Sequence, residues 1–262
     1  MRTLAALLAV LALLPACLDD PSPPGDGDGD GDGDGDTISI EVAGTVTDWA
    51  SGEPVAGAEV AVDVAFQGDE LFPISRPPVA TLASGADGRF GPATVELPGT
   101  TEAPPVVLFK VAGAELADTA SDRRASCDET GCQSIDQSIS VPSTSLAADW
   151  RQALADGGLA EAASRGLVVF EFRESGGEPA AGVAVERSGD PPETGAVRYL
   201  ADDGVAVAAA DADSTRASGV ALIAGDTELG LVGGSRGEDV WDPVGVLFAD
   251  GWLFLEDERP VP

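Results

Sequence analysis

The chain has 262 residues, of which 46 are acidic, 14 are basic, three are cysteine and none is histidine, and its formal net charge is −32. Without histidine the chain cannot build a Ser-His-Asp triad or the usual histidine-containing zinc sites, and three cysteines are too few for a four-thiolate site. Nucleic-acid binding is excluded as well, because it depends on many Lys and Arg side chains that neutralise phosphates. With 44% hydrophobic residues, the length predicts about two modest domains with sizeable cores.

The N-terminus carries an apolar run from Leu4 to Leu14 that ends in Leu14-Pro15-Ala16-Cys17. This run has the length of a secretory signal and is too short to span a bilayer. Its last four residues resemble the lipobox of bacterial lipoproteins, which implies that Cys17 is the site of lipid attachment. By the same resemblance, Leu18 after the cysteine implies an outer-membrane location, periplasmic or surface-exposed. The alternative is an ordinary signal peptide cut after Ala16.

Residues 18–36 include six Gly-Asp pairs, and we expect a disordered acidic tether because mutually repelling carboxylates and glycine offer nothing to bury. The stretch from Asp30 to Glu41 matches the spacing of an EF-hand loop, but the flanking helices that such a loop needs are not predicted. A bare charged spacer is the first interpretation, and weak calcium binding is the alternative.

A repeat and many short strands indicate an all-β fold. The segment Gly52–Val60 recurs as Gly177–Val185 with six of nine positions identical, and each copy is a turn that leads into an alternating strand. Further strands are expected at 38–46, 79–83, 90–97, 106–111 and 135–141, and then at 167–172, 197–200, 205–209, 220–223, 229–232, 244–248 and 252–255. This pattern predicts two antiparallel, Ig-like or transthyretin-like β-sandwiches.

Three segments resemble the motifs of the carboxypeptidase regulatory-like (transthyretin-like) domain, namely Gly44–Asp48, Gly52–Val60 and Ser84–Phe90. The resemblance covers about residues 37–141 and implies a seven-stranded sandwich without catalytic residues, of a kind often attached to secreted or outer-membrane proteins. The second half repeats the second motif and has a blurred third motif at Thr215–Ala221. The expected organisation is a signal peptide (1–17), the tether (18–36), one sandwich (37–143), a helical connector (144–166) and a second sandwich (167–262).

The connector is predicted from an apolar stripe in residues 145–155, with Ser145 as a cap and Trp150 and Leu154 on the stripe. It is expected to cover the end of a sandwich, with docking of a partner as the alternative. Cys127 and Cys132 form a C-x4-C pair that favours a disulfide in an oxidising compartment, whereas a redox motif would need C-x-x-C and a metal site more ligands.

Acidic clusters are first interpreted as solvated surface charge, and no cofactor is expected. Asp211 and Asp213 are candidates for bridging loops through calcium. Glu171 lies between Phe170 and Phe172, and alternation along the strand places it on the opposite face, where we expect it to be exposed.

These observations favour a non-enzymatic, lipid-anchored protein of the cell envelope whose sandwiches act as a binding or spacer module. Its partners would be the membrane, through the N-terminal lipid, and an unidentified envelope protein or glycan. The alternative is a carboxylate-based hydrolase that acts on extracellular or cell-wall carbohydrate. Two carboxylates that converge in a cleft would favour this second hypothesis.

Overall fold

The computed structural model describes residues 37–67, 70–71, 77–188, 196–209, 212–225 and 229–258. Cys17, the acidic tether and Asp211 lie outside these ranges, so the lipid anchor and the tether stay predictions. The first half of the described chain contains β1 (Thr37–Asp48), β2 (Glu59–Val64), β3 (Phe66–Gln67), β4 (Glu70–Leu71), β5 (Ala80–Ala83), β6 (Arg89–Pro98), β7 (Val106–Ala112), β8 (Thr119–Arg124), β9 (Cys127–Asp128), β10 (Gly131–Cys132) and β11 (Ile135–Val141).

The connector and the second half follow. They contain α1 (Thr144–Leu154), the π-helical turn η2 (Ala155–Leu159), α2 (Ala160–Arg165), β12 (Leu167–Phe172), β13 (Ala184–Ser188), β14 (Ala196–Tyr199), β15 (Val220–Ala224), β16 (Leu229–Arg236), β17 (Asp239–Leu247) and β18 (Leu253–Glu258). The helical connector predicted for 144–166 is therefore confirmed as an element, and Gly158, with φ of 88°, separates its two α-helices.

Each half is a β-sandwich, as expected for an all-β fold. In the first half the sheet β11-β1-β6 packs on β5-β2-β7-β8, and in the second half β14-β15-β12-β18 packs on β13-β16-β17. Alternation explains the first core, because Ile38, Ile40 and Val42 of β1 point inward while Thr37, Ser39 and Glu41 between them are exposed. One difference from the expected antiparallel arrangement is that β1 pairs with β11, and β12 with β18, in parallel.

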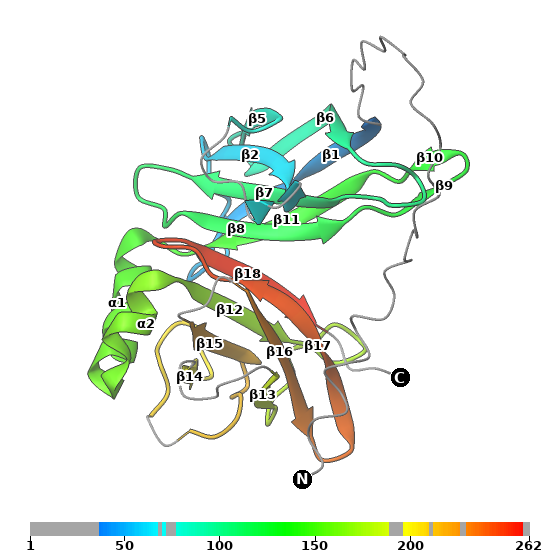
Figure 1. Cartoon of the computed structure of the whole chain (residues 1–262). Helices are drawn as coiled ribbons and strands as arrows, with labels where there is room; N and C mark the ends of the chain where they lie inside the picture. The colour runs from blue at the N-terminus through cyan, green and yellow to red at the C-terminus, as the bar shows by residue number, and fades with distance from the viewer. Residues whose placement is uncertain are drawn as a thin grey trace, which may run out of the picture. The chain divides into compact units, whose positions relative to one another are not determined.

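The two halves share one sheet. Strand β8 of the first half pairs in parallel with β18 of the second half, with Thr119, Ala120 and Ser121 opposite Leu253, Phe254 and Leu255. The result is a continuous eight-stranded sheet in the order β14-β15-β12-β18-β8-β7-β2-β5, in which β12, β18 and β8 lie side by side (Figure 1). The predicted domain boundaries are not tested by this pairing, but the sandwiches are joined by backbone hydrogen bonds as well as by the connector.

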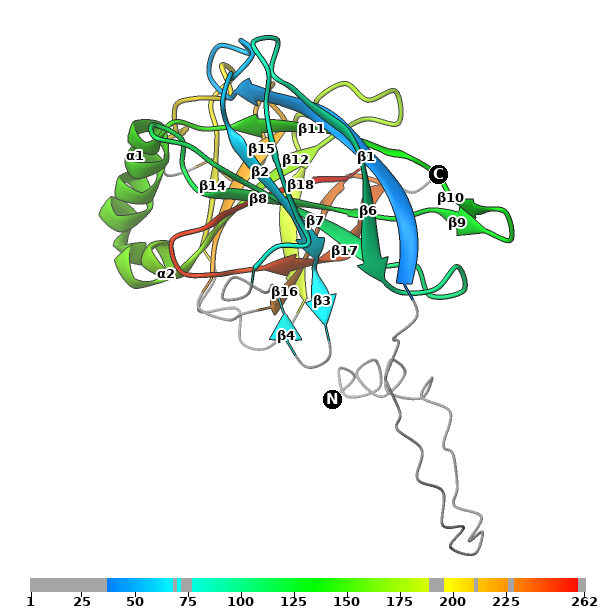
Figure 2. The same ribbon diagram turned by 90° about the horizontal axis from the view of Figure 1, so that it is seen from above.

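The connector covers one face of this sheet beside the first sandwich. Trp150 and Leu154 of α1 are fully buried against Leu167, Leu222 and other residues of β12 and β15. Both views place α1 and α2 at the opposite side of the fold from the β9–β10 hairpin (Figures 1 and 2).

The strand predicted at 205–209 is wrong. Only an isolated bridge joins Leu200 and Val207, and the carbonyls of Gly204 and Val205 instead accept hydrogen bonds from Trp49 and Trp150.

The sequence repeat is also a repeat of hydrogen bonds. The hydroxyl of Ser84 donates to the Val55 carbonyl and accepts from the Ala58 amide, and the hydroxyl of Thr215 does the same with Ala180 and Val183. The blurred third motif therefore has the same local structure as its counterpart in the first half.

Glycine is required at matching positions of the two copies. Gly88 and Gly219 both have positive φ, of 75° and 70°, and an added Cβ would lie 2.5 Å and 2.6 Å from the carbonyl oxygens of Val46 and Phe172. The strand pairing repeats as well. Strand β1 pairs with β6 in antiparallel and with β11 in parallel orientation, and β12 pairs in the same two ways with β15 and β18, so these strands correspond.

Candidate functional site

A polar cleft of about 400 Å³ lies where the two halves meet. Its size falls in the range of small-ligand pockets, but its lining is far more polar than that of a typical one. The lining residues come from β8, β11, β12, β18 and two turns: Trp49, Ser121, Arg123, Asp136, Gln137, Ser138, Ser140, Val169, Glu171, Arg173, Gly177, Leu255 and Glu256.

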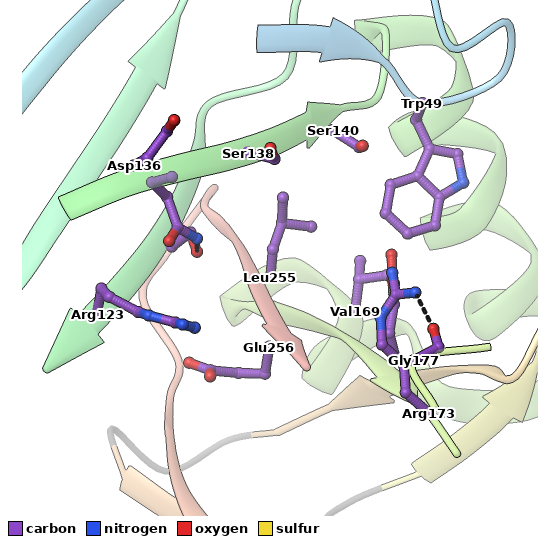
Figure 3. Close-up of a pocket in the computed structure, with 13 residues that line it drawn as sticks. Trp49, Arg123, Asp136, Ser138, Ser140, Val169, Arg173, Gly177, Leu255 and Glu256 are labelled. Carbon is purple, nitrogen blue, oxygen red and sulfur yellow. Dashed lines mark hydrogen bonds and ion pairs between the residues drawn. The ribbon is translucent and has the colours of Figure 1, made fainter. Parts of the chain in front are cut away.

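The shared sheet creates the cleft. Ser121 and Arg123 on β8 and Leu255 on β18 belong to its floor, because alternate residues of these paired strands point to the same face. Strand β11, an edge of the smaller sheet of the first sandwich, forms one wall, and β12 with the turn that follows it forms the other (Figure 3). The joint between the halves thus leaves a sheet edge facing an open cleft.

Oppositely charged side chains lie close together at two places in the cleft. Arg173 forms an ion pair with Glu171 and donates to the Gly177 carbonyl at 2.9 Å. Arg123 and Glu256 point toward one another at the opposite end of the cleft (Figure 3).

The expectation that Glu171 is exposed is wrong. Its side chain is 25% exposed and lines the cleft. Alternation did place it opposite Phe170 and Phe172, which are buried in the core of the second sandwich. However, the first half covers that opposite face in part, because β18 lies between β12 and β8 in the shared sheet and so brings the first half beside β12.

Trp49 closes one end of the cleft and is held from two sides. Its indole nitrogen donates to the Gly204 carbonyl at 2.7 Å, and its ring meets Trp150 edge to face with 5.7 Å between centroids. Trp150 in turn donates to the Val205 carbonyl. These contacts link the end of β1, the connector and a loop of the second half, so the ring at the rim of the cleft is positioned by all three.

Hydroxyl groups line the β11 wall. Ser138 and Ser140 contact Thr45 and Thr47 of β1 through their hydroxyls at 3.3 Å and 3.1 Å, and the buried amide of Gln137 donates to Ser121 at 3.0 Å. The wall therefore offers donors and acceptors on a fixed strand rather than on a loose loop.

An acid with an altered pKa lies on the other face of the sheet. Burial raises the pKa of Asp122 above its ordinary value of 3.8. Its neighbours Ser121 and Arg123 line the cleft, so alternation turns the Asp122 side chain away from it. The sheet thus separates this carboxyl group from Glu171.

The other predicted site residues have different outcomes. The Cys127–Cys132 disulfide is confirmed and joins the two short strands of the β9–β10 hairpin. The calcium hypothesis remains a prediction, since Asp211 is outside the described ranges and the carboxylate of Asp213 accepts a hydrogen bond from Ser214. In the described residues, no three His, Cys, Asp or Glu side chains are grouped to hold a metal ion.

Sequence reasoning missed most of the cleft. Arg123 and Asp136 attract no attention in the sequence, and Glu256 belongs to an acidic cluster that is interpreted as surface charge. The three residues come from strands far apart in the chain, so no local pattern brings them together. Part of the signal was present, since Asp136, Ser138 and Ser140 alternate with buried Ile135 and Ile139. Such a strand is amphipathic, but its position at an edge depends on pairing that the sequence does not encode.

Comparisons with known proteins identify no family. No family model matches the chain, and no curated protein matches it. A D295N mutant of the shaft pilin SpaA from Lactobacillus rhamnosus GG is 14% identical over 86% of this chain and 99% of its own, with a TM-score of 0.27. Chlorocatechol 1,2-dioxygenase from Pseudomonas putida is 14% identical over 40% of this chain and 61% of its own, with a TM-score of 0.28. These scores are too low to support an inference about function.

Among the described residues, no helix has the length and apolar character needed to cross a membrane.

Proposed function

We propose that this protein is a non-enzymatic, lipid-anchored module of the cell envelope that binds a partner in the polar cleft. The supporting observation is the cleft itself, which is built on paired strands of both sandwiches and lined by charged and hydroxyl side chains. Lipidation at Cys17 would hold the protein at the outer membrane, and residues 18–36 would hold the sandwiches away from the bilayer. A rigid two-sandwich body at the end of a spacer suits presentation of such a surface.

The arrangement of the acids supports binding rather than catalysis. Glu171 is already engaged by Arg173, an ion pair that a catalytic acid would have to give up. The carboxyl group whose pKa is raised by burial, Asp122, is on the other face of the sheet. General acid catalysis near neutral pH needs such a raised pKa inside the reaction site.

A hydrolase acting on carbohydrate is the second candidate, and one observation favours it. Asp136, Glu171 and Glu256 all line the same cleft, and paired carboxylates are the usual equipment of glycosidases. If Glu171→Gln abolished a measurable hydrolytic activity of the mature protein, the enzyme hypothesis would replace the binding module.

A crosslinked pull-down of the mature protein from its native envelope tests the proposed function. We expect an envelope component to be captured by the wild type and lost with the double variant Arg123→Ala, Asp136→Ala, whose two side chains line the cleft. The matched control is the double variant Arg89→Ala, Glu96→Ala, which removes one exposed positive and one exposed negative charge from β6, the opposite edge of the same sheet as β11. Equal capture by the wild type and both double variants would contradict binding in the cleft.

A further inference from the structure

We infer that the open edge of β11 accepts an extended peptide segment of a partner protein, which adds to the sheet as a strand parallel to β11. This inference rests on the proposed function, because it names the kind of partner that the cleft would hold. In the described structure, β11 pairs with β1 on one side, and no strand pairs with its other side, which faces the cleft. Main-chain groups on such an edge are ready to pair with an added strand.

β11 lacks the features that normally protect sheet edges. Its seven residues run in uninterrupted register with β1, from Ile135 to Val141, without proline or bulge. A strand of this length spans about 23 Å. Asp136 is the single charged side chain on it.

The other edges of the described sheets, two-residue strand pairs aside, differ from β11. Strands β5 and β14 have four residues each. Strand β6 contains Pro92 and pairs across a register shift, β17 contains Pro243 and pairs across a register shift, and β13 has five residues and carries the exposed Glu186. Short length, proline, irregular register and charge all oppose pairing between edges. Compared with these edge strands, β11 combines greater length with regular pairing.

The internal repeat contains a counterpart of the β11 edge that already pairs with an added strand. Strand β18 corresponds to β11, since each pairs in parallel with the first strand of its own sandwich. The free side of β18 is not open, because β8 of the other half adds to it in parallel through Thr119, Ala120 and Ser121. The same edge of the same fold therefore already accepts a further parallel strand within this molecule. By correspondence, an added strand would run along β11 in the same direction and begin opposite Ile135 and Asp136.

The lining describes the chemistry of the partner strand. The cleft holds three carboxylates and two guanidinium groups, and the chain as a whole carries −32, so a segment with Lys or Arg is favoured over an acidic one. Apart from Trp49 at one end, the apolar part of the lining is limited to Val169 and Leu255. The remaining inward side chains of the partner are therefore expected to be small or polar, like those of β8.

The test uses the mature protein and a phage-displayed peptide library. Selected peptides are synthesised and titrated, and each backbone amide of the tightest peptide is methylated in turn. Pairing with β11 requires every second amide of the peptide to donate. We expect alternate N-methyl groups to weaken binding by at least about tenfold and the intervening ones to have little effect. A nitroxide at the N-terminus of the peptide should broaden NMR signals near Ile135, and one at the C-terminus should broaden those near Val141.

Matched variants locate the site. Ser138→Lys places a long charged side chain at an exposed position of the edge and should prevent binding. Thr94→Lys adds the same charge at an exposed position of β6 and should have no effect.

The other outcomes overturn the inference in distinguishable ways. Uniform N-methyl effects, or amide-exchange protection that maps away from residues 135–141, would show that no strand is added to β11. Broadening with the ends reversed would contradict the parallel orientation. If maltotriose or another neutral oligosaccharide bound the cleft and no peptide did, the strand would be wrong while the proposed function would stand. If the Arg123, Asp136 variant captured its envelope component unchanged, the proposed function itself would fail.

Discussion

The two hydroxyl bridges of the repeat allow one prediction to be worked from the structure. Thr215→Val keeps the shape of the side chain but removes the oxygen that accepts from the buried Val183 amide at 2.9 Å and donates to the buried Ala180 carbonyl at 2.7 Å. Each backbone group left without a partner costs about 1–2 kcal/mol, so we expect the free energy of unfolding to fall by about 2–4 kcal/mol. Ser84→Ala should cost somewhat less, about 1–3 kcal/mol, because Val55 is only partly buried and water can reach its carbonyl.

Equilibrium urea unfolding followed by circular dichroism measures both changes. Thr215→Ser is the matched control, since it keeps the hydroxyl that the other copy uses naturally and should cost no more than about 1 kcal/mol. Because β8 and β18 join the sandwiches in one sheet, either valine or alanine variant should shift one common transition. Thr215→Val with the stability of the wild type would refute the hydroxyl bridge. If the protein unfolded in two separate transitions and each variant shifted only one of them, the two sandwiches would not unfold as one unit, which would refute this prediction.

Three further predictions concern single groups. Burial raises the pKa of Asp122, so the folded state holds the proton of this carboxyl group more tightly than the unfolded state does, and stability is lost as the pH rises from 3.8 through the raised pKa. Asp122→Asn should therefore be more stable than the wild type at pH 7, and the difference should disappear in acid. A difference in stability that stays the same at low pH would contradict this. Mass spectrometry of unreduced protein should show the peptide containing Cys127 and Cys132 about 2 Da lighter than its reduced form, and free thiols at both positions would exclude the bridge in the mature protein. Cys17→Ala should lose labelling by a clickable fatty acid and leave the membrane, and full membrane retention of this variant would sink the lipoprotein hypothesis.

The sequence predicts elements well where one strand face is apolar. Strand β1 shows the expected alternation and strand β12 the expected apolar run, and the apolar stripe of α1 correctly indicates the connector. The expected cap was wrong, because Ser143 and not Ser145 caps this helix. The repeat of Gly52–Val60 also predicts matching turns, and the hydrogen bonds of Ser84 and Thr215 confirm that the match extends to the blurred third motif.

Strand β8 shows where this reasoning ends. Its sequence, Thr-Ala-Ser-Asp-Arg-Arg, has no large apolar residue and does not resemble a buried strand. It is a strand because β7 and β18 supply hydrogen-bond partners on both sides, and Thr119, Ala120 and Ser121 are small enough to be buried there. The joint between the halves, the cleft above it and the partial burial of Glu171 all follow from this one strand, so none of them was predictable from local patterns.

Site-specific photocrosslinking in intact cells is the most direct test of the claim that the cleft binds an envelope partner. A photoreactive amino acid is placed at Ser138, on the cleft wall, or at Thr94, an exposed position on the opposite edge of the same sheet. We expect a discrete crosslinked product from position 138 and none from position 94, and a protein rather than a glycan in that product would favour the added strand. The absence of any product from position 138, or the same product from both positions, would contradict the account.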